Sequence, residues 1–286
     1  MCIRDRSSGV VGGTSAQGLD NVAIGRSALG VLTIGINNIA IGRAAADALT
    51  SGSNNVVFGL NALGAATAHS CNNVAIGQDT MGTGVGGGSA GEGSFNVAIG
   101  QNALSATTTG TDNVAIGTNA HCEHTTGRWN VSLGKGAFAT ATTGCLNVAI
   151  GNNALGGAIT TGNANIAMGE NTMDALTTGA DNIALGKNAL GAATAHSCNN
   201  VAIGELAMGT GVGGGTAGQG SHNIALGKSA LSTMTNGTNN IGIGQNTNML
   251  INKCMFEKQE SRKHLSRIEE LWKLWKTLNT MLQLFA

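Results

Sequence analysis

The sequence predicts an all-β fold, a parallel solenoid in which a short segment coils about thirteen times and its strands stack on one another. Three observations predict it. The phrase Asn-[Val/Ile]-Ala-[Ile/Leu/Met]-Gly recurs thirteen times with a few substitutions. Glycine makes up 46 of the 286 residues, and the chain has no proline and only 3% aromatic residues. A repeat this short fits a stacked coil better than a helix pair, with a core of small aliphatic side chains.

The copies of the repeat begin at asparagines spaced by 17 or 18 residues, apart from two spacings of 23. They begin at Asn21, Asn38, Asn55, Asn73, Asn96, Asn113, Asn130, Asn147, Asn165, Asn182, Asn200, Asn223 and Asn240. Residues 61–77 also recur unchanged at 188–204, seven coils later. Because parallel strands lie about 4.8 Å apart, thirteen coils predict a rod of roughly 60 Å.

Each unit supplies two short strands and two tight turns. Alternation along the first strand directs unit positions two and four to one face and the Ala at position three to the other. Because Ala replaces the polar residues of a solvated face, we expect another copy of the chain to pack closely against it. The next Gly permits a positive φ at one corner, and Thr-Thr-Gly, as at 142–144, marks the other.

The first Asn of each unit is expected to belong to a ladder of side-chain amides that runs along the rod. An amide both donates and accepts hydrogen bonds, so stacked asparagines can satisfy the backbone groups of the corner. The predicted ladder includes Asn113, Asn130, Asn147, Asn165 and Asn182.

The NVAIG-x-x-AL phrase resembles the head repeat of trimeric autotransporter adhesins, the YadA-like head, and the similar repeats of phage tail-fibre proteins. The resemblance covers roughly residues 19 to 248. It implies a left-handed parallel β-roll in which three chains associate side by side, with surfaces that attach to a host cell or matrix. The units here are 17 residues long, which is longer than the usual adhesin head unit.

Composition divides the chain into an irregular leader at 1–18, the solenoid at 19–250 and a helical segment at 251–286. Residues 1–6 share nothing with the repeats and are treated as a leader, tag or assembly remnant. The last segment has the spacing of a short coiled-coil stalk at Ile268, Leu271, Trp275, Leu278, Leu282 and Phe285. Two alternatives stay open for this segment, a helix that caps a monomeric solenoid and a sequence scrambled by a frameshift near Asn248.

The charge pattern argues against several functions. The formal net charge is zero and only 10% of residues are charged, so we expect neither a nucleic-acid partner nor membrane insertion. Acidic residues occur singly at turns, as at Asp20, Asp112 and Asp181, rather than in acid/base pairs. We therefore expect no enzymatic activity, no catalytic residue and no cofactor.

Four apolar residues are candidate receptor contacts. Trp129 and Leu146 occupy the same unit position in adjacent coils, which predicts an apolar patch for sugar binding or for contact between chains. Val85 and Val212 lie in the glycine-rich inserts 82–94 and 209–221. Such loops leave one face of a solenoid and often carry recognition, although a passive loop is the alternative.

The histidine and cysteine residues offer weaker candidates. His121 and His124 are the candidate metal ligands, on the idea that three copies of His121 converge on a trimer axis; the alternative is a tolerated substitution. Cys71, Cys145 and Cys198 share one unit position in coils three or four apart, too far for a disulfide within the chain. Free thiols are typical of assembly in a reducing cell.

These observations predict a structural or adhesive fibre segment of a virion, a phage tail fibre, that forms a homotrimer and presents a surface to a host receptor or glycan. The first alternative is the head of a trimeric autotransporter adhesin on a bacterial surface. The second is an ice-binding or other monomeric solenoid, against which the corner position of the Thr pairs argues. A tail-spike enzyme is the remaining alternative, against which the scarcity of paired carboxylates argues.

Overall fold

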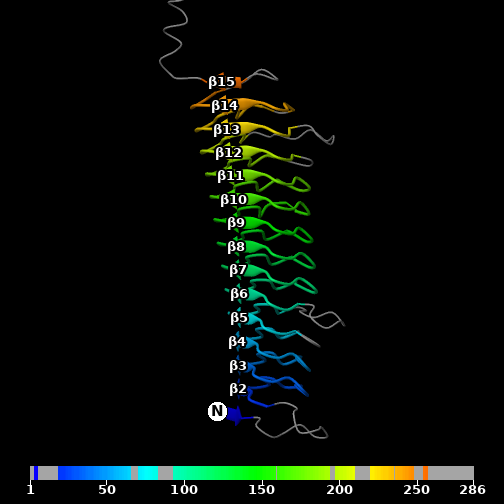
Figure 1. Ribbon diagram of the computed structural model, residues 1–286. Coiled ribbons are helices and arrows are strands. Elements are labelled where there is room, and N and C mark those ends of the chain that lie inside the picture. Colours follow the sequence, from blue (N-terminus) through cyan, green and yellow to red (C-terminus); the bar gives the residue numbers. More distant parts are fainter. Residues whose placement is uncertain are drawn as a thin grey trace, which may run out of the picture.

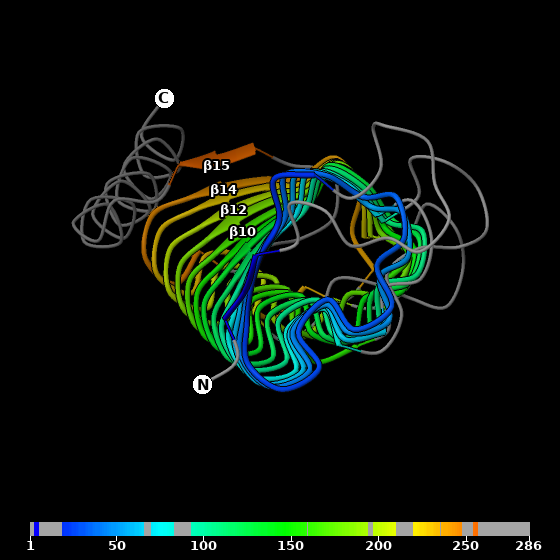
Figure 2. The ribbon, with the colours of Figure 1, turned by 90° about the horizontal axis from the view of Figure 1, so that it is seen from below.

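The computed structural model describes residues 3–5, 19–65, 70–82, 93–158, 160–193, 197–209, 220–234, 236–247 and 254–256. In these residues the chain is an all-β parallel solenoid whose coils stack into a rod (Figure 1). Seen along the rod, successive coils nearly superimpose, each turned slightly from the one before (Figure 2). The predicted all-β parallel solenoid is confirmed for the described residues, with one strand in each of the thirteen predicted repeats.

Every strand is three residues long. They are β1 (Ile3–Asp5), β2 (Val22–Ile24), β3 (Ile39–Ile41), β4 (Val56–Phe58), β5 (Val74–Ile76), β6 (Val97–Ile99), β7 (Val114–Ile116), β8 (Val131–Leu133), β9 (Val148–Ile150), β10 (Ile166–Met168), β11 (Ile183–Leu185), β12 (Val201–Ile203), β13 (Ile224–Leu226), β14 (Ile241–Ile243) and β15 (Cys254–Phe256). They form one sheet in sequence order. β1 is antiparallel to β2, and the remaining pairs are parallel; from β2 to β14 they align the same unit position in neighbouring coils.

The expectation of two strands per coil is wrong for the described residues, where each repeat forms one. The Asn-Ala-Leu segment after the strand turns instead. In the β9 coil, Asn153 and Leu155 have φ values of 53° and 51°, which are incompatible with an extended chain. The turn places Ala154 and Leu155 in the interior, where both are fully buried.

The strand Ala residues also face the interior, and this corrects the expected packing. Ala149, Ala167 and Ala184 have no exposed surface, and they cluster with the buried Leu and Met of the same chain. Their close neighbour is therefore the chain's own core rather than another copy. A small side chain recurs here because the buried Leu of the coil packs close to this position: a Cβ added to Gly242, its equivalent in β14, would lie 2.7 Å from the Leu231 side chain.

The glycine after each strand lets the coils stack directly. Gly151 has a φ of 134°, and a Cβ added to it would lie 2.4 Å from the carbonyl oxygen of Gly169 in the next coil. Any side chain at this corner would both strain the backbone and separate the coils.

The repeat asparagines form a buried ladder along the rod. Asn165 donates from its backbone N–H and its Nδ2 to Oδ1 of Asn147, at 2.9 and 3.1 Å. Its own Oδ1 accepts the backbone N–H and Nδ2 of Asn182, at 3.1 and 2.9 Å. The Nδ2 group also donates to the carbonyl of Gly179 at 2.9 Å. Each amide thus connects three coils and satisfies a corner carbonyl.

Several predictions fall outside the described residues. Val85 and Val212 lie outside them, and so does the predicted leader 1–18 except for strand β1. The predicted start of the solenoid domain at residue 19 is described. Of the predicted helical segment 251–286, only Cys254–Phe256 is described, as strand β15. In the part of the chain that the structure describes, no helix has the length and apolar character needed to cross a bilayer.

Candidate binding surface

The outward strand face carries ten of the seventeen exposed large hydrophobic side chains of the described residues. We use this name for the side chains at the first and third residues of β2 to β14, such as Val148 and Ile150, which alternate with the buried Ala. Ten of these side chains are 36–44% exposed, among them Leu133 and Met168. Because the strands lie about 4.8 Å apart, the face extends along roughly 60 Å of the rod. Soluble monomers rarely leave so long an apolar surface uncovered.

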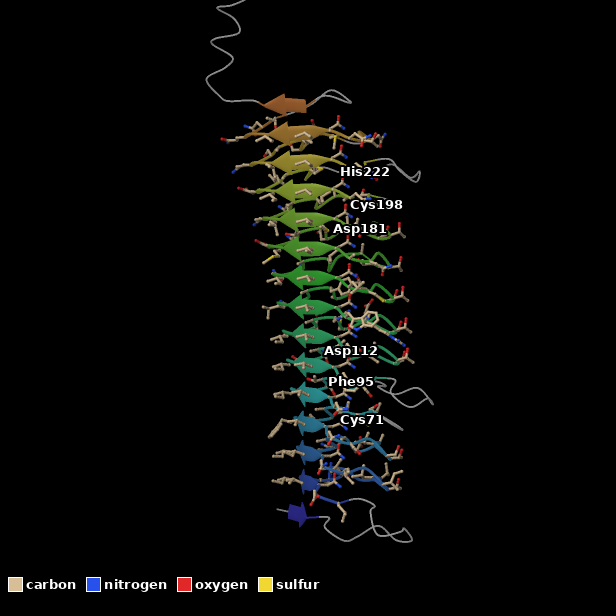
Figure 3. The ribbon with its side chains drawn as sticks, viewed as in Figure 1. Cys71, Phe95, Asp112, Asp181, Cys198 and His222 are labelled. Atoms are coloured by element: carbon tan, nitrogen blue, oxygen red, sulfur yellow. The ribbon has the colours of Figure 1, made fainter. Side chains whose placement is uncertain are left out.

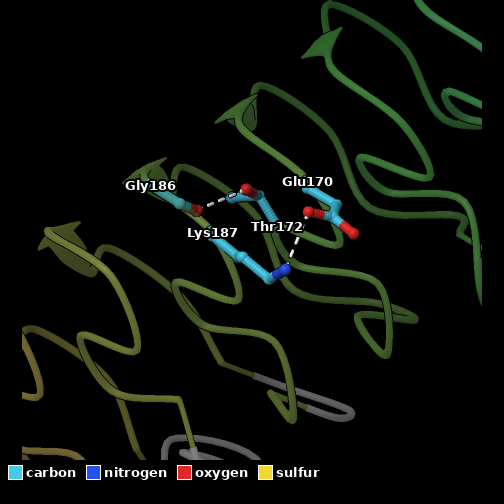
Figure 4. Close-up of polar contacts among 4 residues, drawn as sticks. All are labelled: Glu170, Thr172, Gly186 and Lys187. Carbon is cyan, nitrogen blue, oxygen red and sulfur yellow. Dashed lines mark hydrogen bonds and ion pairs between the residues drawn. The ribbon is translucent and has the colours of Figure 1, made fainter.

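Charged side chains lie beside this face, just after the corner glycine. Glu170 and Lys187 of adjacent coils form an ion pair at 2.9 Å, and Glu205 and Lys228 form another at 2.9 Å. The hydrogen bond and charge of Glu170 raise the pKa of Lys187. Figure 4 shows this pair next to the hydroxyl of Thr172, which donates to the carbonyl of Gly186 at 2.7 Å.

Replacing Glu170 with Gln is expected to leave the melting temperature unchanged. Both side chains of the pair are about half exposed, at 54% and 46%, so solvent screens the attraction and either partner is hydrated when alone. Differential scanning calorimetry at low and high salt checks this. A clear loss of thermal stability that salt abolishes would contradict the prediction.

A second surface is formed by the residues that immediately precede the ladder asparagines, one in each coil. We call this set of residues the edge column. All thirteen of its residues have φ between 55° and 61°. This left-handed conformation costs an ordinary residue roughly 1–2 kcal/mol, and Asn and Asp tolerate it best. Eight of the thirteen are Asn or Asp. Figure 3 shows Phe95, Asp112, Asp181 and His222 of this column along one edge of the strands.

The structure brings both predicted patch residues to the edge column. Trp129 and Leu146 are each 55% exposed and lie in adjacent coils. It also adds Phe95, which is 56% exposed and which the sequence reasoning missed. Counting back one residue from Asn96 would have found it, but the long insert before Phe95 interrupts the regular spacing. Asp112, also exposed, occupies the coil between Phe95 and Trp129.

The candidate metal ligands lie inside the coil. His121 has no exposed surface, and its ring centroid lies 3.9 Å from that of His124 and 4.6 Å from that of Phe138. His121 therefore cannot meet its copies on an axis outside the solenoid, which corrects the proposed metal geometry. It occupies the buried position that Leu104 and Leu155 fill in other coils, facing the core. Among the described residues, no three His, Cys, Asp or Glu side chains gather into a metal-binding group.

The histidine pair is buried with most of its polar atoms unsatisfied. Both ring nitrogens of His121 and Nδ1 of His124 lack hydrogen-bond partners. Only Nε2 of His124 is bonded, to the carbonyl of Gly127 at 2.9 Å. Burial, and then the neighbouring His124, lowers the pKa of His121 well below its ordinary value. Burial also lowers the pKa of His124. Both rings are therefore neutral in the folded rod at pH 7.

Of the four cysteines whose side chains the structure describes, Cys71, Cys145 and Cys198 share one position between coils. Cys71, Cys122, Cys145 and Cys198 are half-buried and form no disulfide. Sγ of Cys145 accepts the backbone N–H of Arg128 at 3.4 Å, just as Oγ of Ser53 accepts that of Ile36 at 3.1 Å. A thiol at this position thus replaces a hydroxyl that bridges two coils.

Comparison with known proteins found no family model that matches the chain and no similar curated protein.

Proposed function

We propose that the chain is a structural and adhesive fibre segment, part of a phage tail fibre or related virion appendage, and that three copies associate to present a host-recognition surface. The observation that carries this proposal is the outward strand face. A side of the rod that is apolar at two positions in every coil is suited to permanent contact with other chains.

The dimensions of this face support an assembly of copies. Stable protein interfaces bury about 800 Å² per partner, and obligate ones are larger and more apolar. A face with two apolar side chains per coil over thirteen coils provides this buried area when a partner of equal length covers it from end to end. A second copy of this rod has the same length and the same coil spacing. Three copies, the number implied by the YadA-like resemblance, would cover the face on every chain, with each chain a left-handed β-roll.

The interior supports a mechanical role. The Asn ladder and the parallel backbone bonds connect each coil to its neighbours without long loops in the described coils. Such a rod holds a binding surface at a fixed distance and orientation from its base, as an attachment fibre requires. The half-buried free thiols of Cys71, Cys145 and Cys198 favour assembly in a reducing cell and so a virion part.

The second candidate is the head of a trimeric adhesin on a bacterial surface, since the repeat resembles that head equally. It shares the same assembly and the same attachment role. The gene's neighbouring sequence separates the two, since virion structural genes flank a tail-fibre gene and a membrane anchor accompanies an adhesin.

Light scattering on the purified chain is expected to give three times the 28.4 kDa chain mass. Lysine at two stacked positions of the outward strand face, Ile150→Lys with Met168→Lys, is expected to give a monomer, because three-fold association would bury six stacked positive charges.

The matched control is Val31→Lys with Ile34→Lys, which changes two exposed apolar side chains, 53% and 47% exposed, away from the strand face. This control should keep the mass of the wild type. A wild-type monomer would overturn the fibre proposal, and equal masses for the two double variants would show that the strand face is not the interface.

A further inference from the structure

The edge column changes character in the middle of the rod. In the coils of β2 to β5 every residue of the column is Asn or Asp. Four of the five exceptions in the whole column, Phe95, Trp129, Leu146 and Ala164, fall within the five successive coils of β6 to β10. Drift in a repeat would scatter such residues along the rod. Bulky side chains with a left-handed backbone also occur inside most coils, as at Leu104 and Leu155, but those side chains fill the core. Phe95, Trp129 and Leu146 adopt the same conformation at an exposed position that elsewhere favours Asn or Asp, and such exposed apolar exceptions gathered in one stretch point to function.

These side chains form a rigid, evenly spaced row. The backbone N–H groups of Asp112, Trp129 and Leu146 donate to carbonyls of the preceding coil at 3.2, 3.3 and 3.0 Å. The coil spacing of about 4.8 Å places Phe95 and Trp129 about 10 Å apart along the rod, with Asp112 between them. A buried ladder Asn follows each of them directly, which fixes the backbone below the row.

We propose that Phe95, Asp112, Trp129 and Leu146 bind a carbohydrate chain that lies along the rod. An aromatic side chain that is more than half exposed, as Phe95 and Trp129 are, offers its ring to the C–H face of a sugar. The Asp112 carboxylate accepts hydrogen bonds from sugar hydroxyls, and Arg128, which is exposed and directly precedes Trp129 in the chain, offers donors. Leu146 extends the apolar contact by one coil. This inference rests on the proposed function, to which it adds the chemical class of the host-surface ligand.

The size of the row favours a glycan over a protein. It is one side chain wide and spans four coils, about 15 Å. A stable protein interface needs about 800 Å² on each partner, which is more than the four side chains of this row can supply. Its alternation of apolar and charged side chains also fits a ligand that presents C–H faces and hydroxyl groups together.

The test uses substitutions that restore the residue preferred in this column. Trp129→Asn and Phe95→Asn relieve backbone strain, so both variants should fold with an equal or higher melting temperature. The probe is an immobilised panel of linear hexasaccharides of glucose, galactose, mannose, rhamnose and N-acetylglucosamine. We expect the wild-type chain to bind at least one member, and each variant to bind that member about tenfold to a hundredfold more weakly, the effect of losing one buried aromatic contact.

The matched control is His222→Asn, which makes the same kind of change in the same column outside the row, and it should bind as the wild type does. Binding to no member of the panel, or equal binding by Trp129→Asn, would overturn the glycan site. Light scattering on the same samples distinguishes failure of the glycan site from failure of the fibre proposal. A trimer that binds no sugar overturns only the glycan site, and a Trp129→Asn variant that loses the trimer identifies the row as a contact between chains instead.

Discussion

Replacing Asn165 with Ala is expected to lower the free energy of unfolding by about 2–6 kcal/mol, because it leaves two buried polar groups without a partner and each costs about 1–3 kcal/mol. The Asn182 backbone N–H loses its acceptor and the Gly179 carbonyl loses its donor, while Nδ2 of Asn182 keeps its bond to the Ser197 carbonyl. None of these groups can hydrogen-bond to water instead, since the ladder is buried. The vacated amide volume adds a cavity to this loss.

Hydrogen exchange read at individual amides is the appropriate measurement, since a stack of coils can open locally. Loss of protection should be greatest in β9, β10 and β11, whose coils the Asn165 amide connects, and weaker at both ends of the rod. Asn152→Ala, an exposed amide five residues from that ladder's Asn147, is the control and should change little. A loss below about 1 kcal/mol for Asn165→Ala would mean that water replaces the ladder bonds.

Acidification is expected to destabilise the coils of β7 and β8 through His121 and His124. Their pKa values in the folded chain are lowered by burial, whereas an unfolded histidine titrates near pH 6.5. Below that pH the unfolded chain binds more protons than the folded chain, so stability falls as the pH falls and is fully present above about pH 6.5. Each histidine that protonates only on unfolding contributes a slope of about 1.4 kcal/mol per pH unit.

This slope holds over the pH range in which the buried rings stay neutral. Urea unfolding of the wild type and of the double variant His121→Leu with His124→Leu, at pH 7.5 and pH 4.5, measures the difference. Leu is the matched replacement, since Leu155 and Leu176 fill the two positions in other coils and are buried. The variant should be more stable at both pH values and should lose less stability on acidification. Equal losses in the two proteins would assign acid sensitivity to other groups.

The candidate surface was predictable in part. Trp129 and Leu146 could be paired from the sequence because both immediately precede a repeat Asn, and equivalent positions of a solenoid stack. Phe95 follows a long insert that hides this equivalence. The meaning of the row depends on the left-handed backbone of the edge column, which makes Asn the preferred residue and the aromatic side chains exceptions. Composition alone does not reveal that preference.

The repeat by itself determined the parallel stacking, the register, the Asn ladder and the glycine corner, because each of these follows from one local rule applied at a constant spacing. Only the tertiary structure decided which strand face is inside. Alternation separates Ala149 from Val148 and Ile150, but it does not say which set faces the core. The interior of the coil takes the small side chain of the strand, and the larger aliphatic side chains of the strand point outward. The same closed interior holds His121 and His124 and keeps their rings away from any surface where copies could meet.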